Sequence, residues 1–179
     1  MQKTAKLSFA LTGWKVDQFL PPDTKRCVLV VAPHTSGWDL FYGRMAFFLF
    51  DRPAFFLIKD DYMRIPLKQF LTLIGGIGVD RSRSNNLTSI LVSLIREHDE
   101  IVLAITPEGT RSVSNRWKTG FYHIAMEAGV PIALMYLDYQ RKRVGISQPF
   151  TPCGEFESDM QYIENCYRTV CARYPQKYN

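Results

Sequence analysis

A histidine and an aspartate lie five residues apart in the polar segment PHTSGWD, residues 33–39, directly after an apolar, strand-like run. An imidazole can take up a proton near neutral pH, and a neighbouring carboxylate can hold its tautomer and stabilise the charged ring. His34 could therefore act as a general base toward an alcohol that attacks a carbonyl carbon, with Asp39 as its partner. Such a reaction needs no nucleophile from the enzyme itself.

The spacing of these two residues limits the local structures in which their side chains can meet. Residues five apart on a continuous helix diverge by about 140° around the helix axis. His34 and Asp39 can therefore meet only if His34 lies on a loop and Asp39 lies in the first turn of the next helix, with Ser36 as the N-cap. The same pattern also fits a plain helix cap in which Asp39 has no chemical role, and this segment alone leaves both interpretations open.

A second polar segment, TPEGTRS at residues 106–112, follows another strand-like run. Gly109 permits a tight turn, the hydroxyl of Thr110 can donate hydrogen bonds, and the guanidinium of Arg111 matches the geometry of phosphate oxygens. We expect Glu108 to shape this loop rather than to contact substrate. Lys118 follows it as a further cation. The segment predicts a phosphate cradle, although a polar turn with a surface arginine would have the same composition.

A third segment, GGIGVDR at residues 75–81, places an aspartate and an arginine at the end of a short apolar strand. Arg81 could bind an anion, or Asp80 and Arg81 could form a solvated ion pair. Ligands of parallel sheets gather at the carboxyl ends of the strands. We therefore expect all three segments to lie at the same edge of one sheet.

Strand-like and helical segments alternate along the chain, which predicts an α/β fold: a single domain over residues 1–179 with a central, largely parallel sheet flanked by helices. The pattern is hydrophobic alternation or short apolar runs for strands and a 3.6-residue period for helices. The predicted strands are residues 27–32, 54–58, 77–79, 100–105, 130–137 and 143–146, and the predicted helices are residues 4–20, 37–50, 65–74, 87–98, 120–128 and 156–173.

The chain is basic, with a formal charge of +5 and a pI of about 9.1. This balance suits nucleic acids, anionic membranes or phosphorylated small molecules. The sequence has no basic stripe interleaved with aromatic residues and no recognisable nucleic-acid module, so we expect no nucleic-acid partner. Phe-rich runs at residues 45–50 and 53–58 favour lipid, although most apolar runs in folded domains are interior.

Residues 4–20 are predicted to form a short amphipathic helix, with Leu7, Ala10, Leu11 and Trp14 along one side. The sequence contains no run of about 20 uncharged apolar residues that could span a bilayer, and its first residues are too polar for a signal peptide. We therefore expect a cytoplasmic protein.

The four cysteines show no Cys-x-x-Cys pair and no histidine partners at zinc spacing, which predicts buried, reduced thiols and no metal site. They are Cys27, Cys153, Cys166 and Cys171.

Taken in order, these segments resemble the glycerolipid acyltransferase family, which includes the lysophosphatidic acid acyltransferases. The family's first block is a histidine, four residues and an aspartate, as in HTSGWD at residues 34–39. Its next blocks are similar to GGIGVDR at residues 75–81, PEGTRS at 107–112 and KTG at 118–120. Its Val-Pro-Ile block matches residues 130–132, but Leu134 stands where a second proline is common.

The resemblance implies a glycerolipid acyltransferase-like fold and the transfer of a fatty acyl group from acyl-CoA or acyl carrier protein to a hydroxyl of a lysophospholipid such as lysophosphatidic acid. It implies no bound cofactor, since the acyl thioester is a substrate. His34 and Asp39 would be the catalytic pair, and Arg81, Arg111 and Lys118 would bind the phosphate of the acceptor.

The sequence lacks the long N-terminal pair of hydrophobic helices that is common in this family. Membrane attachment would then depend on residues 4–20 or on exposed aromatic side chains, peripheral on the cytoplasmic face. Two alternatives remain at this stage. One is an O-acyltransferase with a lipoamino-acid or other non-phosphate acceptor, whose carboxylate the arginines would bind. The other is a non-catalytic module that binds lipid or an acyl carrier.

Overall fold

The structure, a computed structural model, describes residues 1–50, 53–80, 86–114 and 116–178. Its strands are β1 (Lys15–Val16), β2 (Arg26–Val31), β3 (Ala54–Lys59), β4 (Gly76–Val79), β5 (Ile101–Ile105), β6 (Ile132–Asp138) and β7 (Arg143–Ile146). Its α-helices are α1 (Gln2–Thr12), α2 (Gly37–Phe50), α3 (Leu67–Leu73), α4 (Leu87–Glu97), α5 (Gly120–Ala128) and α6 (Phe156–Tyr167). Two short 3-10 helices are η1 (Asp60–Tyr62) and η3 (Pro175–Lys177).

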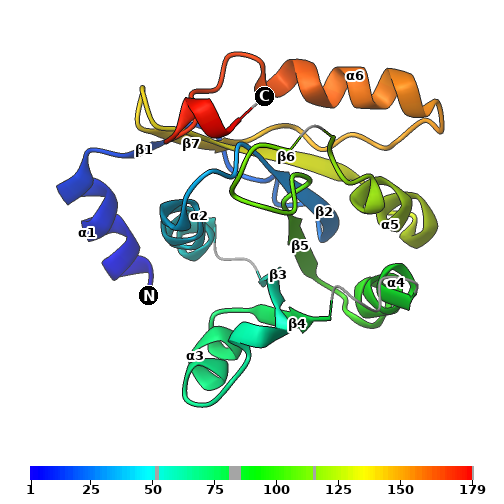
Figure 1. Ribbon diagram of the computed structural model, residues 1–179, viewed down its shortest axis with the longest axis horizontal. Helices are drawn as coiled ribbons and strands as arrows, with labels where there is room; N and C mark the ends of the chain where they lie inside the picture. The colour runs from blue at the N-terminus through cyan, green and yellow to red at the C-terminus, as the bar shows by residue number, and fades with distance from the viewer. Residues whose placement is uncertain (51–52, 81–85, 115, 179) are drawn as a thin grey trace.

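The strands form one seven-stranded sheet in the order β1-β7-β6-β2-β5-β3-β4 (Figure 1). Neighbouring strands are parallel except β6 and β7, which are antiparallel. The largely parallel sheet flanked by helices that the alternating pattern predicts is therefore confirmed. Strands β2 and β5, which precede the two polar loops of interest, are direct neighbours near the middle of this sheet.

Helices cover both faces of the sheet. The chain runs one way across the sheet through α2 and α3 and returns through α4 and α5, and right-handed connections place these two pairs on opposite faces. The side chains of β2 alternate accordingly. Val28 and Val30 pack in a core with α4, α5 and α6, whereas Cys27 and Leu29 pack in a second core with α1 and α2. Because β2 is buried on both faces after its exposed first residue, Arg26, its sequence is apolar from Cys27 to Val31.

The N-terminal helix is shorter than predicted, and its exposed side differs from the expected one. Helix α1 stops before Gly13, which adopts a left-handed φ of 75° and donates its N–H to the carbonyl of Phe9. The rest of the predicted range, residues 4–20, contains strand β1 instead. Phe9 is buried, whereas Leu7 and Leu11 of the predicted apolar side are 59% and 78% exposed.

The C-terminal helix is also shorter than the predicted range of residues 156–173. After α6 the chain turns back toward the sheet, where the carbonyl of Cys171 accepts the N–H of Tyr139 at 2.9 Å.

The four cysteines are free thiols, but only Cys27 is buried, so the expectation of buried thiols was wrong for the other three. Cys153 and Cys166 are exposed, and Cys171 is partly exposed.

Two glycines make the tight connection between α3 and β4. Gly75 adopts a φ of +87°, and a Cβ atom at this position would overlap the carbonyl oxygen of Ala54. A Cβ atom on Gly76 would lie 2.8 Å from the carbonyl oxygen of Leu71. The paired glycines of the GGIGVDR segment are therefore required by close backbone packing between β3, α3 and β4.

We predict that Gly75→Ala lowers the free energy of unfolding by about 2 kcal/mol or more, because the methyl group meets backbone and the residue must keep a positive φ. Denaturant unfolding measures this change. The control is Gly120→Ala at the start of α5, where a Cβ atom would meet nothing within 4 Å. That variant should unfold at the same or a slightly higher denaturant concentration, since alanine favours helix. Equal effects of the two changes would contradict the packing argument.

Candidate active site

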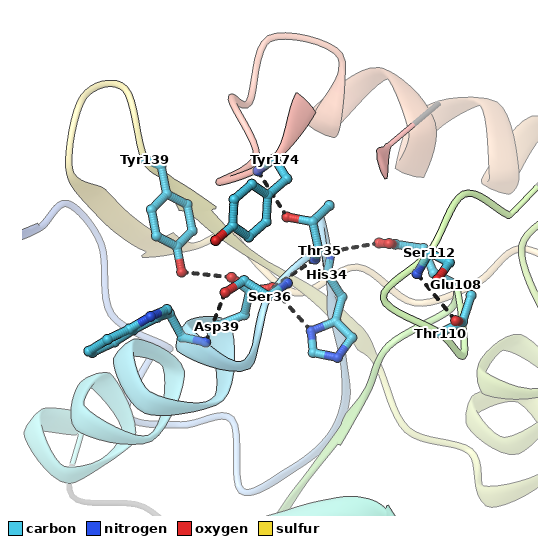
Figure 2. Close-up of polar contacts among 10 residues, drawn as sticks. His34, Thr35, Ser36, Asp39, Glu108, Thr110, Ser112, Tyr139 and Tyr174 are labelled. Atoms are coloured by element: carbon cyan, nitrogen blue, oxygen red, sulfur yellow. Dashed lines mark hydrogen bonds and ion pairs between the residues drawn. The ribbon is translucent and has the colours of Figure 1, made fainter. Parts of the chain in front are cut away.

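The segment with His34 and Asp39 lies at the carboxyl end of β2. Because β2 ends at Val31 and α2 begins at Gly37, the histidine lies on the connecting loop and the aspartate lies in the first helical turn, as the spacing predicts. The Nδ1 atom of His34 is 3.3 Å from Oδ2 of Asp39 (Figure 2). The histidine side chain is 21% exposed and that of the aspartate only 2%. The imidazole can thus be reached from solvent while its partner is buried.

Asp39 also caps α2. Its Oδ2 atom accepts the backbone N–H groups of Thr35 and Ser36, each at 2.8 Å. In turn, the Ser36 hydroxyl accepts the N–H of Trp38 at 3.1 Å. This reciprocal arrangement is a capping box. The two interpretations of the sequence are therefore compatible, because one carboxylate both caps the helix and contacts the histidine.

The loop that follows β5 is joined to the loop that follows β2. The Oε1 atom of Glu108 accepts the backbone N–H of His34 at 2.8 Å, and Glu108 is only 4% exposed. Since β2 and β5 are paired in register, their following loops leave the sheet side by side. Glu108 thus joins the loop after β5 to the loop that carries His34.

The remaining residues of the predicted cradle lie around the same turn. Gly109 adopts a φ of +65°, and the Lys118 side chain crosses it so closely that a Cβ atom would lie 2.9 Å from Cε and 3.1 Å from Nζ. The Thr110 hydroxyl accepts the N–H of Ser112 at 3.2 Å. The guanidinium of Arg111 reaches the N-terminus of α2, where a Cβ atom on Gly37 would lie 3.3 Å from Nη1. Arg111 therefore lies beside the histidine segment, and Lys118 lies across the turn at Gly109.

The third predicted cation, Arg81, lies outside the described residues. The strand that leads to it, β4, is at the edge of the sheet and is separated from β2 by β5 and β3. In the described part of the chain, His, Cys, Asp and Glu side chains form no group of three or more that could hold a metal ion.

Comparison with known proteins agrees with this geometry. The model of the acyltransferase family matches residues 16–137, which include both polar loops. The chain belongs to the acyltransferase family. Among similar proteins are 1-acyl-sn-glycerol-3-phosphate acyltransferases of Haemophilus influenzae, 26% identical over 78% of this chain and 60% of the relative, and of Salmonella typhimurium, 25% identical over 77% and 58%. A third, from Limnanthes alba, is 30% identical over 64% of this chain and 42% of the relative.

The fold of this acyltransferase also matches a solved structure. The 1-acyl-sn-glycerophosphate acyltransferase PlsC of Thermotoga maritima superposes with a TM-score of 0.64 over 92% of this chain and 74% of that chain, at 20% sequence identity. The shared fold is thus clear despite low identity. The chain spans about 60% of the length of the first two bacterial relatives.

The candidate site contains a carboxyl group, that of Glu108, whose pKa is well above its ordinary value. The pKa of Glu108 is raised from 4.5 to about 7, chiefly by burial and to a smaller extent by the nearby charge of Asp39, while the hydrogen bond from the His34 N–H acts in the opposite direction. A carboxyl group in this environment changes its charge near neutral pH. The link between the two loops is therefore sensitive to pH.

Three further residues of the site were not predicted from the sequence. Tyr139 donates to Oδ1 of Asp39 at 2.6 Å, and the N–H of Tyr174 donates to the Thr35 hydroxyl at 3.3 Å. Arg173 lies over the ring of Trp38, 5.3 Å from its centroid. The position of Tyr139 directly after β6 was an available signal, because residues at the carboxyl ends of parallel strands line such sites. Residues 173–174 carry no such signal.

We predict that the free energy of unfolding falls as pH rises from about 4.5 to about 7, because the unfolded chain releases the Glu108 proton first. Glu108→Gln keeps an oxygen that can accept the His34 N–H but cannot ionise. This variant should lose less stability between pH 5 and pH 8 than the wild type, by a difference on the order of 2 kcal/mol. Denaturant unfolding across that range measures it. The same change at the exposed Glu127 should leave the wild-type pH dependence in place, and a Glu108→Gln curve parallel to wild type would contradict the assignment.

Proposed function

We propose that this chain transfers a fatty acyl group from the thioester of acyl carrier protein or coenzyme A to a hydroxyl of a lysophospholipid such as lysophosphatidic acid. One observation carries the proposal: a buried carboxylate, Asp39, contacts the Nδ1 atom of a partly exposed imidazole, His34, at the carboxyl edge of the sheet. The names of the similar bacterial and plant proteins support a phosphate-bearing glycerolipid as the acceptor.

In this mechanism the Nε2 atom of His34 removes the proton of the acceptor hydroxyl as its oxygen attacks the thioester carbonyl carbon. The Asp39 carboxylate accepts a hydrogen bond from the Nδ1–H group and stabilises the imidazolium that forms. The carbon–sulfur bond then breaks, and the imidazolium returns its proton to the departing thiolate. An ester and a free thiol are the products, so the protein ends each cycle unchanged and forms no covalent intermediate.

The cations of the β5 loop would orient the acceptor. Arg111 lies beside the N-terminus of α2, and Lys118 lies across the turn at Gly109, so both can reach a phosphate whose neighbouring hydroxyl is at His34. A guanidinium binds two oxygens of one phosphate in a fixed geometry. Holding the acceptor in this way converts an encounter into an oriented attack. Arg81 is proposed to join them from the end of β4.

We predict that His34→Ala lowers the rate of acyl transfer by about 10² to 10⁴, the usual contribution of a general base. Arg111→Ala should chiefly raise the KM for acceptors that bear a phosphate. The measurement uses purified protein, a labelled acyl thioester, and a panel of lysophospholipid and lipoamino-acid acceptors.

Two controls match these changes. His123→Ala removes an exposed imidazole from α5, and Arg116→Ala removes an exposed guanidinium from the same loop as Arg111; both should leave transfer unchanged. Product formation only with carboxylate acceptors would favour the lipoamino-acid alternative. No transfer by the wild type, with equal acyl-carrier binding by His34→Ala, would identify a binding module. Thioester loss without an acceptor would indicate a hydrolase.

We further propose that the enzyme works at the cytoplasmic face of a membrane as a peripheral protein. No helix in the described residues has the length and apolar character needed to cross a bilayer. Exposed apolar side chains gather on α1 and α3, on the side of the sheet that also carries α2 (Figure 1). On α3, Phe70 and Leu73 are 56% and 75% exposed beside Lys68. Neither Gln2–Thr12 nor Leu67–Leu73 contains an acidic residue, so their charge suits anionic lipid headgroups.

We predict weak, reversible binding to vesicles that contain anionic phosphatidylglycerol, and less binding to vesicles of neutral phosphatidylcholine. Leu73→Glu should reduce this binding several-fold in a vesicle sedimentation assay, because it places a charge among the apolar side chains of α3. The control is Ile90→Glu on α4, a side chain that is 60% exposed on the opposite face. Equal loss from both variants would contradict the proposed orientation.

A further inference from the structure

The carboxylate of Asp39 has a partner that belongs to neither polar loop. The hydroxyl of Tyr139, the residue directly after β6, donates to Oδ1 at 2.6 Å. The other oxygen, Oδ2, accepts the two backbone N–H groups of the helix cap and lies beside the imidazole of His34. The two oxygens therefore have separate partners: one is held by the tyrosine and the other faces the histidine (Figure 2).

Tyr139 is itself held in place by aromatic and backbone contacts. Its ring packs edge-on against Trp14, with centroids 5.0 Å apart, and against Tyr42, with centroids 6.1 Å apart. Its N–H donates to the carbonyl of Cys171 at 2.9 Å. The guanidinium of Arg173 lies 5.6 Å from the ring centroid. These contacts come from three separate parts of the chain, so the position of the hydroxyl does not depend on Asp39 alone.

We propose that Tyr139 is a positioning residue for acyl transfer, which fixes the Asp39 carboxylate so that Oδ2 faces Nδ1 of His34. This proposal rests on the proposed function. A carboxylate can turn about its terminal bond over a broad range, and a hydrogen bond to a charged group restrains that rotation. The hydroxyl of Tyr139 donates to Asp39, so in this proposal it acts through the carboxylate and not on a reacting atom.

The hydroxyl remains a donor under working conditions. Burial raises the pKa of Tyr139 well above its ordinary value, and the hydrogen bond to Asp39 raises it further, because a phenolate beside the carboxylate would be repelled. A tyrosine that keeps its proton continues to donate to the aspartate. Its contribution is therefore the same over the pH range in which His34 can act as a base.

Tyr139→Phe tests the proposal, because it removes the hydroxyl and keeps the ring contacts. The expected result is a fall in kcat of about tenfold with KM changed less than twofold, the range expected for one hydrogen bond to a charged group. The control is Tyr136→Phe, on β6, three residues before Tyr139. The Tyr136 hydroxyl donates to Asp17 at 2.9 Å, away from the site, so this variant should keep the wild-type kcat.

A double-mutant comparison separates positioning from general support of the fold. If Tyr139 acts through the carboxylate, Tyr139→Phe should lower kcat in the wild type but cause no further loss in Asp39→Ala, where the partner is gone. An unchanged kcat in the single variant would overturn the proposal. So would the same fractional loss in both backgrounds, since that result indicates a role independent of Asp39.

A spectroscopic measurement is independent of turnover. The ring-nitrogen signals of His34 in ¹⁵N-labelled protein should shift in Tyr139→Phe and remain unchanged in Tyr136→Phe. If the wild type shows no transfer but these signals respond, the proposed function fails and the positioning role remains. If transfer occurs and the signals do not respond, the positioning role fails and the proposed function remains.

Discussion

The negative charge of Asp39 is buried, and the arrangement of the site follows from the need to stabilise it. A buried carboxylate without partners costs several kcal/mol, so it must be surrounded by donors. Here they come from the cap of α2, from the imidazole of His34 and from the end of β6. Each donor fixes a different element relative to the same two oxygens. The parallel sheet makes this possible, because β2 and β6 are neighbours whose carboxyl ends lie side by side.

Much of the fold could be predicted because its signals are local. The bounds of α2 and α5 agree with the sequence prediction, since Gly37, Gly120 and Gly129 mark helix ends next to strongly apolar segments. The N-terminal helix was predicted too long because a run of apolar residues continued past Gly13, and hydrophobic period alone does not show where a chain reverses. Its buried side was also misjudged, since burial depends on contacts with α2 that are not visible in a short window.

The candidate site likewise has features that could be predicted from the sequence and features that could not. His34, Asp39 and the loop at residues 106–112 could be identified from residue types and spacing, because each stands directly after a strand. Tyr139 also stands directly after a strand, but its contact with Asp39 could not be predicted, since it joins residues 100 positions apart and depends on which strands are neighbours. The raised pKa of Glu108 is likewise a property of burial, which the sequence does not give. The role of Arg81 remains a prediction.

The contacts of residues 171–174 with the catalytic loop have a consequence for biosynthesis. The carbonyl of Cys171 accepts a hydrogen bond from Tyr139, and the N–H of Tyr174 donates one to Thr35. Both residues come after α6, the helix that follows the last strand of the sheet. A chain is made from its N-terminus, so all strands of the sheet are made before this segment. The nascent chain would then contain every strand of the sheet before the contacts around His34 and Asp39 are complete.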